Sequence, residues 1–451
     1  MRYLCSECGY STPNWMGRCP QCGGWNTFFE EKTERKPKKS LSPPGVTPVR
    51  LSEVDEADLR EYRRFSSGIG EVDRVLGGGV VEGSLILLSG DPGIGKSTLL
   101  LEIAENVARA GKTVLYVSSE ESLAQVYLRV NRLGFSKTPY LFLLSSDVFE
   151  DILSAIDTLS PHLVIVDSIQ NLSRKESDFL PGSVAMLREL STQFMGIAKK
   201  RGIACILVGH VTKEGVVAGP KTLEHLVDVV LYLEGDPNRP LRMLRGMKNR
   251  FGSTQEVGLL ELGEEGFVEV SDPSLYFLLD GEGSCPGVAR TVLAEGKRAM
   301  VVEIQSLVHP SSFDFPRRVS LGIDLNRLHL LLAVVEKNTR IRFSRHDVYV
   351  SIAGGIRTLE TGLDLALCVS LVSSRLEREV RKDTVFCGEV GLGGEVRSVP
   401  LLEQRLQEAL RVGIRRAVLA RGQKVPPRLA GIECAFCGHI LELFEKEGLR
   451  L

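Results

Sequence analysis

The sequence predicts an α/β fold organised around a parallel β-sheet, and two observations lead to this prediction. A glycine-rich phosphate-binding pattern, residues 90–98 (GDPGIGKST), follows an apolar run at 85–89 and precedes a stretch of helical periodicity at 99–109. Further strand-like apolar runs recur downstream, with helical stretches between the earlier ones, at 113–118, 163–167, 203–208 and 227–233. Continuous apolar strands joined by crossover helices are typical of a parallel sheet covered on both faces. Residues 258–270 have hairpin character and are expected to extend one edge of this sheet.

The glycine-rich loop predicts a site for ATP and Mg²⁺. Glycines let backbone N–H groups turn toward phosphate oxygens, and the following helix points its positive end at the same anion. Lys96 supplies a mobile charge for the β- and γ-phosphates, and the Ser97 hydroxyl can bind Mg²⁺. We expect the whole loop to contact nucleotide: Gly90, Asp91, Pro92, Gly93, Ile94, Gly95, Lys96, Ser97 and Thr98.

Length and composition bound the possible functions. A chain of 451 residues allows two or three domains, and a net charge of −1 means that any contact with DNA needs a local basic patch. The polar start of the chain predicts no signal peptide, and no run approaches the ~18 apolar residues of a membrane helix. Of ten cysteines, four form one N-terminal cluster, which favours a metal site in a reducing cytoplasm over a disulfide scaffold.

This N-terminal cluster consists of two Cys-x-x-Cys-Gly segments, and it predicts a closed, structural zinc site. The four expected ligands are Cys5, Cys8, Cys19 and Cys22. About 25 residues cannot build a core alone, so the metal must supply folding energy. Trp15, Arg18 and Trp25 lie around the cysteines and either pack on the metal site or contact a partner. Residues 30–48, rich in Lys, Pro and Ser, predict a linker whose basic stretch is either solvated or contacts DNA.

Carboxylates at strand ends supply the remaining candidates for ATP hydrolysis. Asp167 ends the 163–167 run beside the phosphate loop, where it is placed to hold Mg²⁺ through water. Glu120 and Glu121 follow the 113–118 run, and one of them is expected to activate or orient the attacking water. His210 ends another strand and either senses the γ-phosphate or is an ordinary loop histidine.

Several segments carry a specific resemblance. Residues 67–79 (SGIGEVDRVLGGG), the phosphate loop and residues 116–122 (YVSSEES) resemble the superfamily of RecA-type recombinases and DnaB-type helicases. The segment 248–252 (KNRFG), together with the four-cysteine finger, resembles the bacterial RadA (Sms) family of DNA-repair proteins, over essentially the whole chain. This resemblance implies a hexameric ring ATPase that binds single-stranded and branched DNA and drives branch migration beside the RecA recombinase. By position, Glu120 matches the catalytic glutamate of the superfamily better than Glu121 does.

Two pairs of cations are expected to act on DNA or on a neighbouring subunit. Lys248 and Arg250 in the KNRFG segment can reach a neighbour's nucleotide or pair with DNA phosphates, and the sequence does not separate these roles. Lys213 and Lys221 lie in the glycine-bearing segment 212–222. The resemblance places DNA-contacting loops of the ring channel at that point of the chain.

The C-terminal part resembles the proteolytic domain of Lon proteases. Apolar-faced helices are predicted at 326–338 and 361–374, with a strand at 347–353 between them. Lon uses a serine nucleophile activated by a lysine. The corresponding positions fall near Gly362-Leu363 and Leu401-Leu402, which supply neither group, so we expect an inactive scaffold for assembly and DNA binding. Its candidate DNA contacts are Arg317, Arg318, Arg340, Arg342 and Arg345.

The predicted architecture is therefore an α/β protein with a RecA-like P-loop ATPase core, a small N-terminal zinc ribbon and a C-terminal Lon-protease-like domain. We expect the finger at 1–29, a linker at 30–62, the ATPase domain at 63–271 and the inactive domain at 272–451. The favoured function is a DNA-dependent motor of recombinational repair, and the alternatives are an ATP-dependent protease and a non-motor regulatory ring ATPase. Cys434, Cys437 and His439 resemble half of a metal-binding pattern, and buried or surface thiols are expected there in preference to a zinc site.

Overall fold

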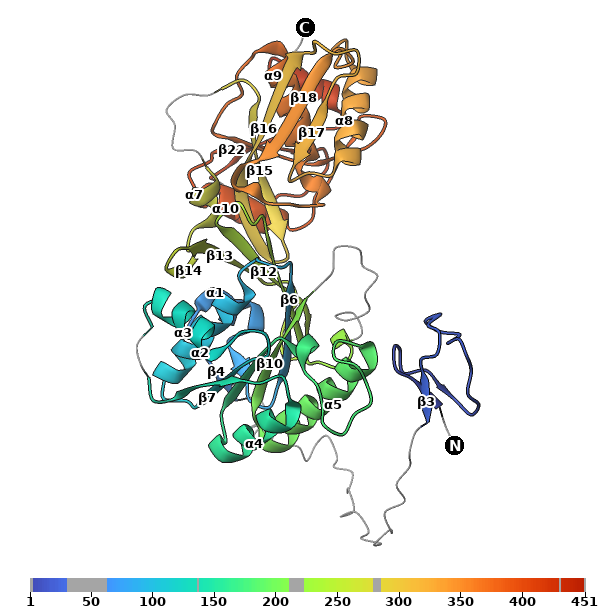
Figure 1. Ribbon diagram of the computed structural model, residues 1–451. Helices are drawn as coiled ribbons and strands as arrows, with labels where there is room; N and C mark the ends of the chain where they lie inside the picture. Colours follow the sequence, from blue (N-terminus) through green and yellow to red (C-terminus); the bar gives the residue numbers. More distant parts are fainter. Residues whose placement is uncertain are drawn as a thin grey trace, which may run out of the picture. The chain divides into compact units, whose positions relative to one another are not determined.

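The computed structural model confirms the α/β class (Figure 1). It describes residues 3–30, 63–135, 138–210, 223–278, 285–429 and 431–449. The chain divides into two compact units. The first comprises Met1–Glu234, Leu244–Thr254 and Leu262–Glu269, and the second comprises Gly235–Met243, Gln255–Glu261 and Val270–Leu451.

The N-terminal ribbon is a small antiparallel sheet of order β2-β1-β3. Its strands are β1 (Tyr3–Cys5), β2 (Ser11–Thr12) and β3 (Phe28–Glu30). Only Cys5, Cys19 and Phe28 form its buried cluster, with Tyr3, Cys8 and Met16 partly buried beside them. So small a core agrees with a ribbon that depends on metal for its stability.

The first unit is built on the predicted sheet, whose order in the described part of the chain is β14-β13-β12-β11-β6-β10-β9-β7-β8. Strands β11 to β8 in this order run parallel. They are β11 (Val229–Gly235), β6 (Leu85–Gly90), β10 (Ala204–His210), β9 (Leu163–Asp167), β7 (Val114–Ser118) and β8 (Leu141–Ser145). The predicted hairpin lies at the edge of the sheet opposite β8. It consists of β13 (Val257–Gly263) and β14 (Gly266–Glu269), and β13 is next to β12 (Leu241–Asn249). A separate pair is β4 (Arg64–Phe65) with β5 (Val80–Val81).

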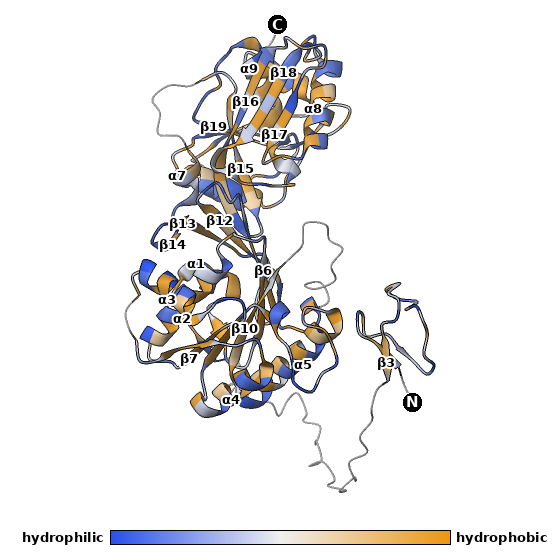
Figure 2. Cartoon of the chain, viewed as in Figure 1, coloured by the Kyte–Doolittle hydropathy of each residue, from blue (hydrophilic) through white to orange (hydrophobic). Residues whose placement is uncertain are grey.

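Helices cover both faces of this sheet because its central strands are apolar on both sides. Helices α4 (Phe149–Leu159) and α5 (Val184–Arg201) share one buried cluster with Leu85 and Leu87 of β6. The alternate residues of β6 are also buried and face α2 (Lys96–Arg109). Further helical elements in the described part of this unit are α1 (Gly70–Leu76), α3 (Leu123–Arg132) and the turn η3 (Ile169–Asn171). Figure 2 shows hydrophobic residues concentrated on the strands and on the inner faces of these helices.

Two features of this sheet differ from the sequence predictions. Strand β8 was not predicted, although residues 141–145 (LFLLS) are a short apolar run; in the structure they are partly or fully exposed at the sheet edge. The strand predicted at 227–233 begins two residues later, at Val229. Asp228 instead accepts the backbone N–H of Leu85 with its Oδ2 at 3.0 Å, which is a cap at the start of β6.

The second unit contains a sheet of order β17-β18-β16-β15-β19-β22-β23 in the described residues. Its strands are β15 (Val288–Glu295), β16 (Arg298–Pro310), β17 (Arg318–Leu321), β18 (His346–Ile352), β19 (Thr384–Cys387), β22 (Arg416–Ala420) and β23 (Glu433–Cys437). Helices α8 (Leu325–Asn338), α9 (Asp364–Leu376) and α11 (Ile440–Lys446) contribute to the core on one face, and α10 (Leu402–Arg411) packs on the other. Short elements complete the unit: α7 (Pro273–Phe277), η4 (Ala353–Gly355), η5 (Thr361–Leu363), β20 (Glu389–Val390), β21 (Val396–Arg397) and η6 (Pro427–Leu429).

Candidate nucleotide-binding site

The phosphate loop joins β6 to α2, as the sequence predicts, and two of its glycines, Gly90 and Gly95, occupy positions without room for a side chain. Gly90 has φ 153°, and a Cβ there would lie 2.3 Å from the carbonyl oxygen of Leu233. Gly95, at the N-terminus of α2, has φ 112° in the left-handed region. Because α2 begins at Lys96, its free N–H groups and its positive end face the loop, which suits a bound phosphate.

Lys96 is the buried cation of this loop. Its side chain is 4% exposed, and its ammonium donates to the carbonyl oxygens of Gly90 at 2.8 Å and Asp91 at 2.9 Å. Burial lowers the pKa of Lys96, and the carboxylates of Asp167, Asp91 and Glu120 oppose that shift. The charge is thus held by neutral carbonyl oxygens, with three acidic groups in its surroundings.

Asp167 and Glu120 meet at the carboxyl ends of neighbouring strands. Ser118 of β7 pairs with Asp167 of β9, so both carboxylates lie at the same edge of the sheet. The hydroxyl of Tyr116 donates to Oδ2 of Asp167 at 3.0 Å, and the hydroxyl of Ser168 donates to Oε1 of Glu120 at 2.7 Å. Burial and the Asp167 charge both raise the pKa of Tyr116, so its hydroxyl remains a donor.

The sequence did not indicate Ser168 and Tyr116 as site residues. Tyr116 lies within the apolar run 113–118, and Ser168 is one residue beyond the strand-end aspartate. The main chain of Ser168 is itself held by Ser119, whose hydroxyl accepts its N–H at 2.9 Å and donates to its carbonyl at 2.8 Å. Both residues orient a predicted carboxylate, and only the juxtaposition of β7 and β9 reveals them.

The two adjacent glutamates have different surroundings. Glu121 pairs with Arg129 of α3 at 2.6 Å, and its N–H donates to the hydroxyl of Ser118 at 3.0 Å. Glu120 instead faces Ser168 next to the strand-end aspartate. Of the pair, Glu120 therefore has the environment expected of a residue that acts on the nucleotide.

The residues present fit a magnesium ion. The Ser97 hydroxyl is on α2, next to Lys96 in the chain. The Asp167 carboxylate is at the end of β9, and its charge acts on the Lys96 ammonium. Hydroxyl and carboxylate oxygens are the hard ligands that Mg²⁺ takes beside nucleotide phosphates. Ser97 and Asp167 are thus the residues that would hold the ion.

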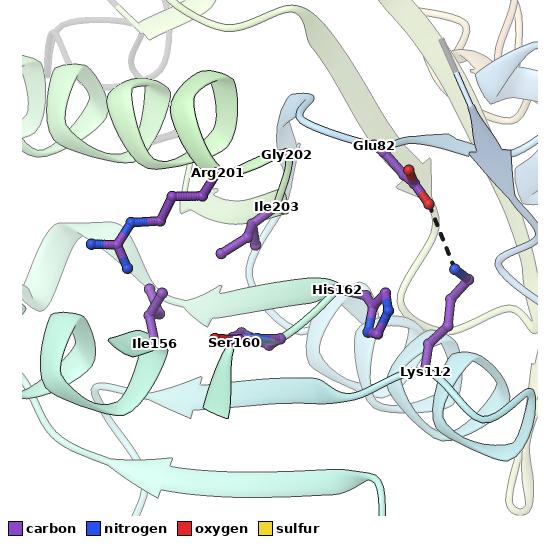
Figure 3. Close-up of a pocket in the computed structure, with 9 residues that line it drawn as sticks. Glu82, Lys112, Ile156, Ser160, His162, Arg201, Gly202 and Ile203 are labelled. Carbon is purple, nitrogen blue, oxygen red and sulfur yellow. Dashed lines mark ion pairs between the residues drawn. The ribbon is translucent and has the colours of Figure 1, made fainter. Parts of the chain in front are cut away.

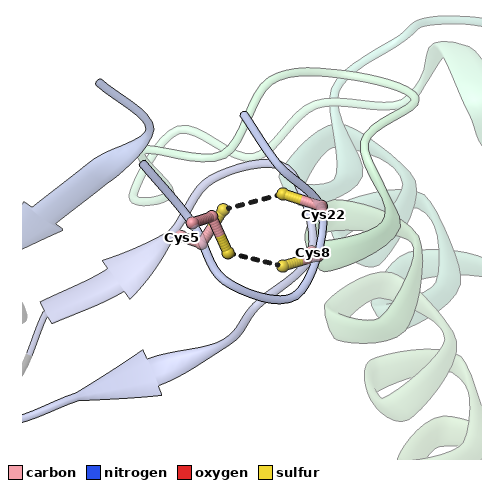
Figure 4. Close-up of side chains that lie close together, drawn as sticks. Cys5, Cys8 and Cys22 are labelled. Carbon is pink, nitrogen blue, oxygen red and sulfur yellow. Dashed lines mark hydrogen bonds between the residues drawn. The ribbon is translucent and has the colours of Figure 1, made fainter. Parts of the chain in front are cut away.

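The four predicted thiols are also brought together. In the described residues, Cys5, Cys8, Cys19 and Cys22 are the group able to hold a metal, with all four Sγ atoms within 4.8 Å of one another. Sγ of Cys5 lies 3.6 Å from that of Cys22, and Sγ of Cys8 lies 3.5 Å from that of Cys19 (Figure 4). Tetrahedral Zn–S bonds of about 2.3 Å separate sulfur atoms by about 3.8 Å, so these spacings fit zinc.

The KNRFG segment lies at the other end of β6 from the phosphate loop. The backbone N–H of Arg250 donates to the carbonyl of Asp228, which caps Leu85 at the start of β6. Gly90 is five residues further along, or about 17 Å at strand spacing. Neither cation of the segment is therefore placed to reach the nucleotide of its own chain.

The two cations of that segment have different surroundings. The ammonium of Lys248 donates to the carbonyl oxygens of Glu224 at 2.7 Å and Val227 at 2.8 Å. Burial lowers the pKa of Lys248, and the neighbouring Arg250 charge adds to that shift. The Arg250 side chain is 57% exposed and has a loose contact of 3.6 Å with Asp228. Lys213 and Lys221 lie outside the described residues, as does the side chain of His210.

A pocket of about 460 Å³ also lies at the amino-terminal ends of the strands. Figure 3 shows Arg201 and Ile156 on one side of it and His162, Lys112 and Glu82 on the other. Its cations already have partners, because Lys112 pairs with Glu82 at 3.6 Å and Arg201 with Asp157 at 2.5 Å. It is separate from the phosphate loop, which lies at the carboxyl end of β6.

In the second unit, the position predicted to correspond to the Lon serine, near Gly362, is closely packed by other residues. A Cβ added to Gly362 would lie 2.5 Å from Oε1 of Glu360 and 3.2 Å from Cγ1 of Val399. Glu360 forms an ion pair with Arg405, whose side chain is fully buried. Arg405 also donates to the carbonyl of Pro400 at 2.9 Å, and Glu360 accepts the N–H of Ala294 at 2.9 Å.

The C-terminal cysteines do not form a second metal site. Cys434 packs with the hydrophobic cluster on one face of the sheet and Cys437 with the cluster on the other. Residues three apart on a strand point to opposite faces. The His439 ring contacts the carbonyl of Gly393 at 3.0 Å and accepts the N–H of Leu441 at 3.2 Å, so it caps α11. These contacts agree with ordinary buried thiols and a structural imidazole.

Comparison with known proteins agrees with each part of this description. Residues 3–30 match the rubredoxin metal binding domain family, residues 52–216 the AAA domain family, and residues 331–423 the subunit ChlI of Mg-chelatase family. Among solved structures, a KaiC-like protein of Pyrococcus horikoshii OT3 aligns with 46% of this chain and 99% of its own, at 21% identity and a TM-score of 0.37.

The fold and site define a P-loop ATPase domain joined to a zinc ribbon and a Lon-like C-terminal domain. The chain is 45% identical to the DNA repair protein RadA of Bacillus subtilis, over 93% of this chain and 92% of that protein. It is 42% identical to the DNA repair protein RadA of Campylobacter jejuni, over 98% of both chains. The chain belongs to the RadA family of DNA repair proteins. No helix among the described residues is long and apolar enough to cross a membrane.

Proposed function

We propose that this chain is a DNA-dependent ATPase that acts as a helicase-type motor in recombinational DNA repair, promoting branch migration of recombination intermediates with the RecA recombinase. One observation supports its ATPase step above all others: the charges of Asp167 and Glu120, which follow the neighbouring strands β9 and β7, act on the Lys96 ammonium of the phosphate loop. The RadA relatives, all described as DNA repair proteins, support the cellular role.

In this proposal the hydrolytic roles follow from the contacts. The Lys96 ammonium exchanges the carbonyl oxygens of Gly90 and Asp91 for oxygens of the β- and γ-phosphates. Glu120, oriented by the Ser168 hydroxyl, orients the attacking water. When bound, Mg²⁺ supplies charge neutralisation for the phosphates, held by Ser97 and Asp167.

We further propose a homo-oligomeric ring, with six subunits as the expected number, in which Arg250 acts on a neighbour's nucleotide or on DNA. Arg250 is the better candidate of the KNRFG pair because it is exposed, whereas Lys248 is engaged with backbone carbonyls of its own chain. Lys213 and Lys221 remain candidate DNA contacts within the ring channel. Single-stranded and branched DNA are the proposed substrates.

The same proposal assigns no proteolysis to the second unit. The absence of a serine and a lysine at the Lon positions and the Glu360–Arg405 pair beside Gly362 support an inactive scaffold. Peptide cleavage by pure protein would contradict this.

The four N-terminal cysteines are proposed zinc ligands, and elemental analysis should find about one zinc per chain, lost in a Cys5→Ala/Cys8→Ala variant.

The test of the motor uses the full chain with ATP and single-stranded or branched DNA. We expect ATP turnover that single-stranded DNA stimulates, and movement of the branch point in a strand-exchange intermediate. Lys96→Ala should abolish both. Turnover that DNA leaves unchanged, with no branch movement, would favour a regulatory ring ATPase that signals to a partner.

A paired substitution tests the choice between the two KNRFG cations. Arg250→Ala should reduce DNA-stimulated turnover by more than about tenfold while the unfolding midpoint stays unchanged, because the removed side chain is exposed. Lys248→Ala should lower the free energy of unfolding by about 1 kcal/mol, because partly buried hydrogen bonds to two carbonyl oxygens are lost. The reverse pattern would assign the outward role to Lys248.

A further inference from the structure

The β13–β14 hairpin at the edge of the sheet lies directly against the phosphate loop. A Cβ added to Gly95 would lie 2.9 Å from Cζ of Phe267 and 3.1 Å from Cδ2 of Leu262. Leu262 is near the end of β13 and Phe267 is on β14, so both strands of the hairpin cover the same glycine. Two apolar side chains therefore support the loop on the side toward which a Cβ at Gly95 would point.

A carboxylate on the same helix fixes this support. The backbone N–H of Phe267 donates to Oε1 of Glu102 in α2 at 2.8 Å. Gly266, at φ 118°, approaches so closely that a Cβ there would lie 2.0 Å from the same oxygen. Gly95 and Glu102 are seven residues apart, which is two helical turns, so both lie on the face of α2 that the hairpin covers.

The far end of the hairpin is also tied down. Glu269, the last residue of β14, accepts the backbone N–H of Glu71 with its Oε1 at 3.1 Å, at the first turn of α1. Burial raises the pKa of Glu102 to about 7, against the opposing effect of the Phe267 N–H, so this carboxyl sits in a largely apolar site. Two hydrogen bonds to two helices thus hold the strand that carries Phe267: one is accepted by Glu102 of α2, and the other is donated by the backbone N–H of Glu71 in α1.

The geometry points to Phe267 as a positioning residue for the phosphate loop, with Glu102 as the latch that holds it in place. This inference rests on the proposed ATPase function and adds to it a source of preorganisation outside the loop. Gly95 gains flexibility from its missing side chain, and phosphate binding must order whatever freedom remains. A ring packed against its α-carbon removes that freedom in advance, so the loop binds the β-phosphate without a further ordering cost.

The test compares neighbouring side chains on β14. Phe267→Ala should raise the KM for ATP, and the Kd of a fluorescent ATP analogue, by about tenfold, with kcat within about threefold of wild type. Val268→Ala is the matched control, because Val268 is the next residue, is 65% exposed, and points to the opposite side of the strand. An unchanged KM and Kd for Phe267→Ala, or a loss confined to kcat, would overturn the inference.

The latch has its own pair of variants. Glu102→Ala should raise KM and Kd by about threefold to fivefold, whereas Glu102→Gln, which keeps an acceptor oxygen for the Phe267 N–H, should rescue both values to near wild type. Equal effects of the two substitutions would overturn the latch role.

If Phe267→Ala does not fold, Phe267→Leu should fold and give an intermediate KM. Wild-type protein that binds the analogue without hydrolysing ATP would count against the proposed function, while the binding comparison still tests this inference.

Discussion

Two buried cations, one in each unit, show how similar side chains serve opposite purposes. Lys96 is 4% exposed and donates to the neutral carbonyl oxygens of Gly90 and Asp91. Arg405 is fully buried and is paired with the carboxylate of Glu360. In the proposed site, Lys96 keeps its charge for an incoming anion because carbonyl oxygens do not neutralise it, whereas Arg405 is already neutralised by a carboxylate and stabilises the fold. For these two cations, the partner of the charge, more than its burial, distinguishes the proposed ligand site from the structural pair.

The largest expected effect tests the structural member of this comparison. Arg405→Met leaves the Glu360 carboxylate without its charged partner and should cost about 3–5 kcal/mol in the free energy of unfolding. Denaturant unfolding of the full chain measures it. The double variant Arg405→Met/Glu360→Leu should recover most of the loss, since no charge is then left unpaired. A single variant within about 1 kcal/mol of wild type would remove the contrast.

The matched change at the phosphate loop should do the opposite. Lys96→Met should lower ATP turnover on the order of 10²–10³-fold, because a charge aimed at the phosphates is lost. Its free energy of unfolding should change by less than about 1 kcal/mol, since burial already disfavours the charged form, as the lowered pKa of Lys96 indicates. Steady-state turnover and thermal unfolding measure both. Strong destabilisation without loss of turnover would show that Lys96 is structural.

The two adjacent glutamates sharpen the comparison within the site. Glu120→Gln should lower turnover on the order of 10²-fold while ATP binding persists, because the amide does not orient or deprotonate water as the carboxylate does. Glu121→Gln should remain within about threefold of wild type, because its partner Arg129 forms a partly exposed ion pair of small energetic value. Exchange of these outcomes would assign the catalytic role to Glu121.

The smallest expected effect concerns pH. The pKa of the Glu102 carboxyl is about 7 in the folded chain, above its ordinary value of 4.5, because burial penalises the charged form. The folded state therefore favours the protonated carboxyl. Its contribution to stability is complete below about pH 4.5 and is lost as the pH rises toward 7, by about 1 kcal/mol after allowance for solvent screening. Unfolding free energies of wild type and Glu102→Gln between pH 5 and 8 should converge at the acidic end. Parallel curves would contradict the shift.

Local patterns predicted most of the fold and of the nucleotide site. The phosphate loop is contiguous, Asp167 ends a recognisable apolar strand, and the cysteines form two short repeats, so their chemistry is visible in neighbouring residues. Strand β8 was missed although residues 141–145 (LFLLS) are a short apolar run, because periodicity alone does not distinguish so short a run from a helix segment.

What the sequence could not show depends on pairs of residues that only folding brings together. The choice of Glu120 over Glu121 gains support from Ser168, 48 positions away. The hydrogen bond from Phe267 to Glu102 spans 165 positions, and the Glu360–Arg405 pair spans 45. No periodicity or motif encodes such contacts, because each depends on the register of strands distant in the chain.

The location of the KNRFG segment has a consequence for how much protein an assay must contain. Arg250 lies beside the start of β6 and Gly90 ends that strand, so one copy of the chain holds the two groups far apart. If Arg250 completes the nucleotide site of a neighbouring subunit, dilution that separates the subunits should abolish ATP turnover. Specific activity would then rise steeply with concentration, and saturating nucleotide could not compensate for scarce neighbours.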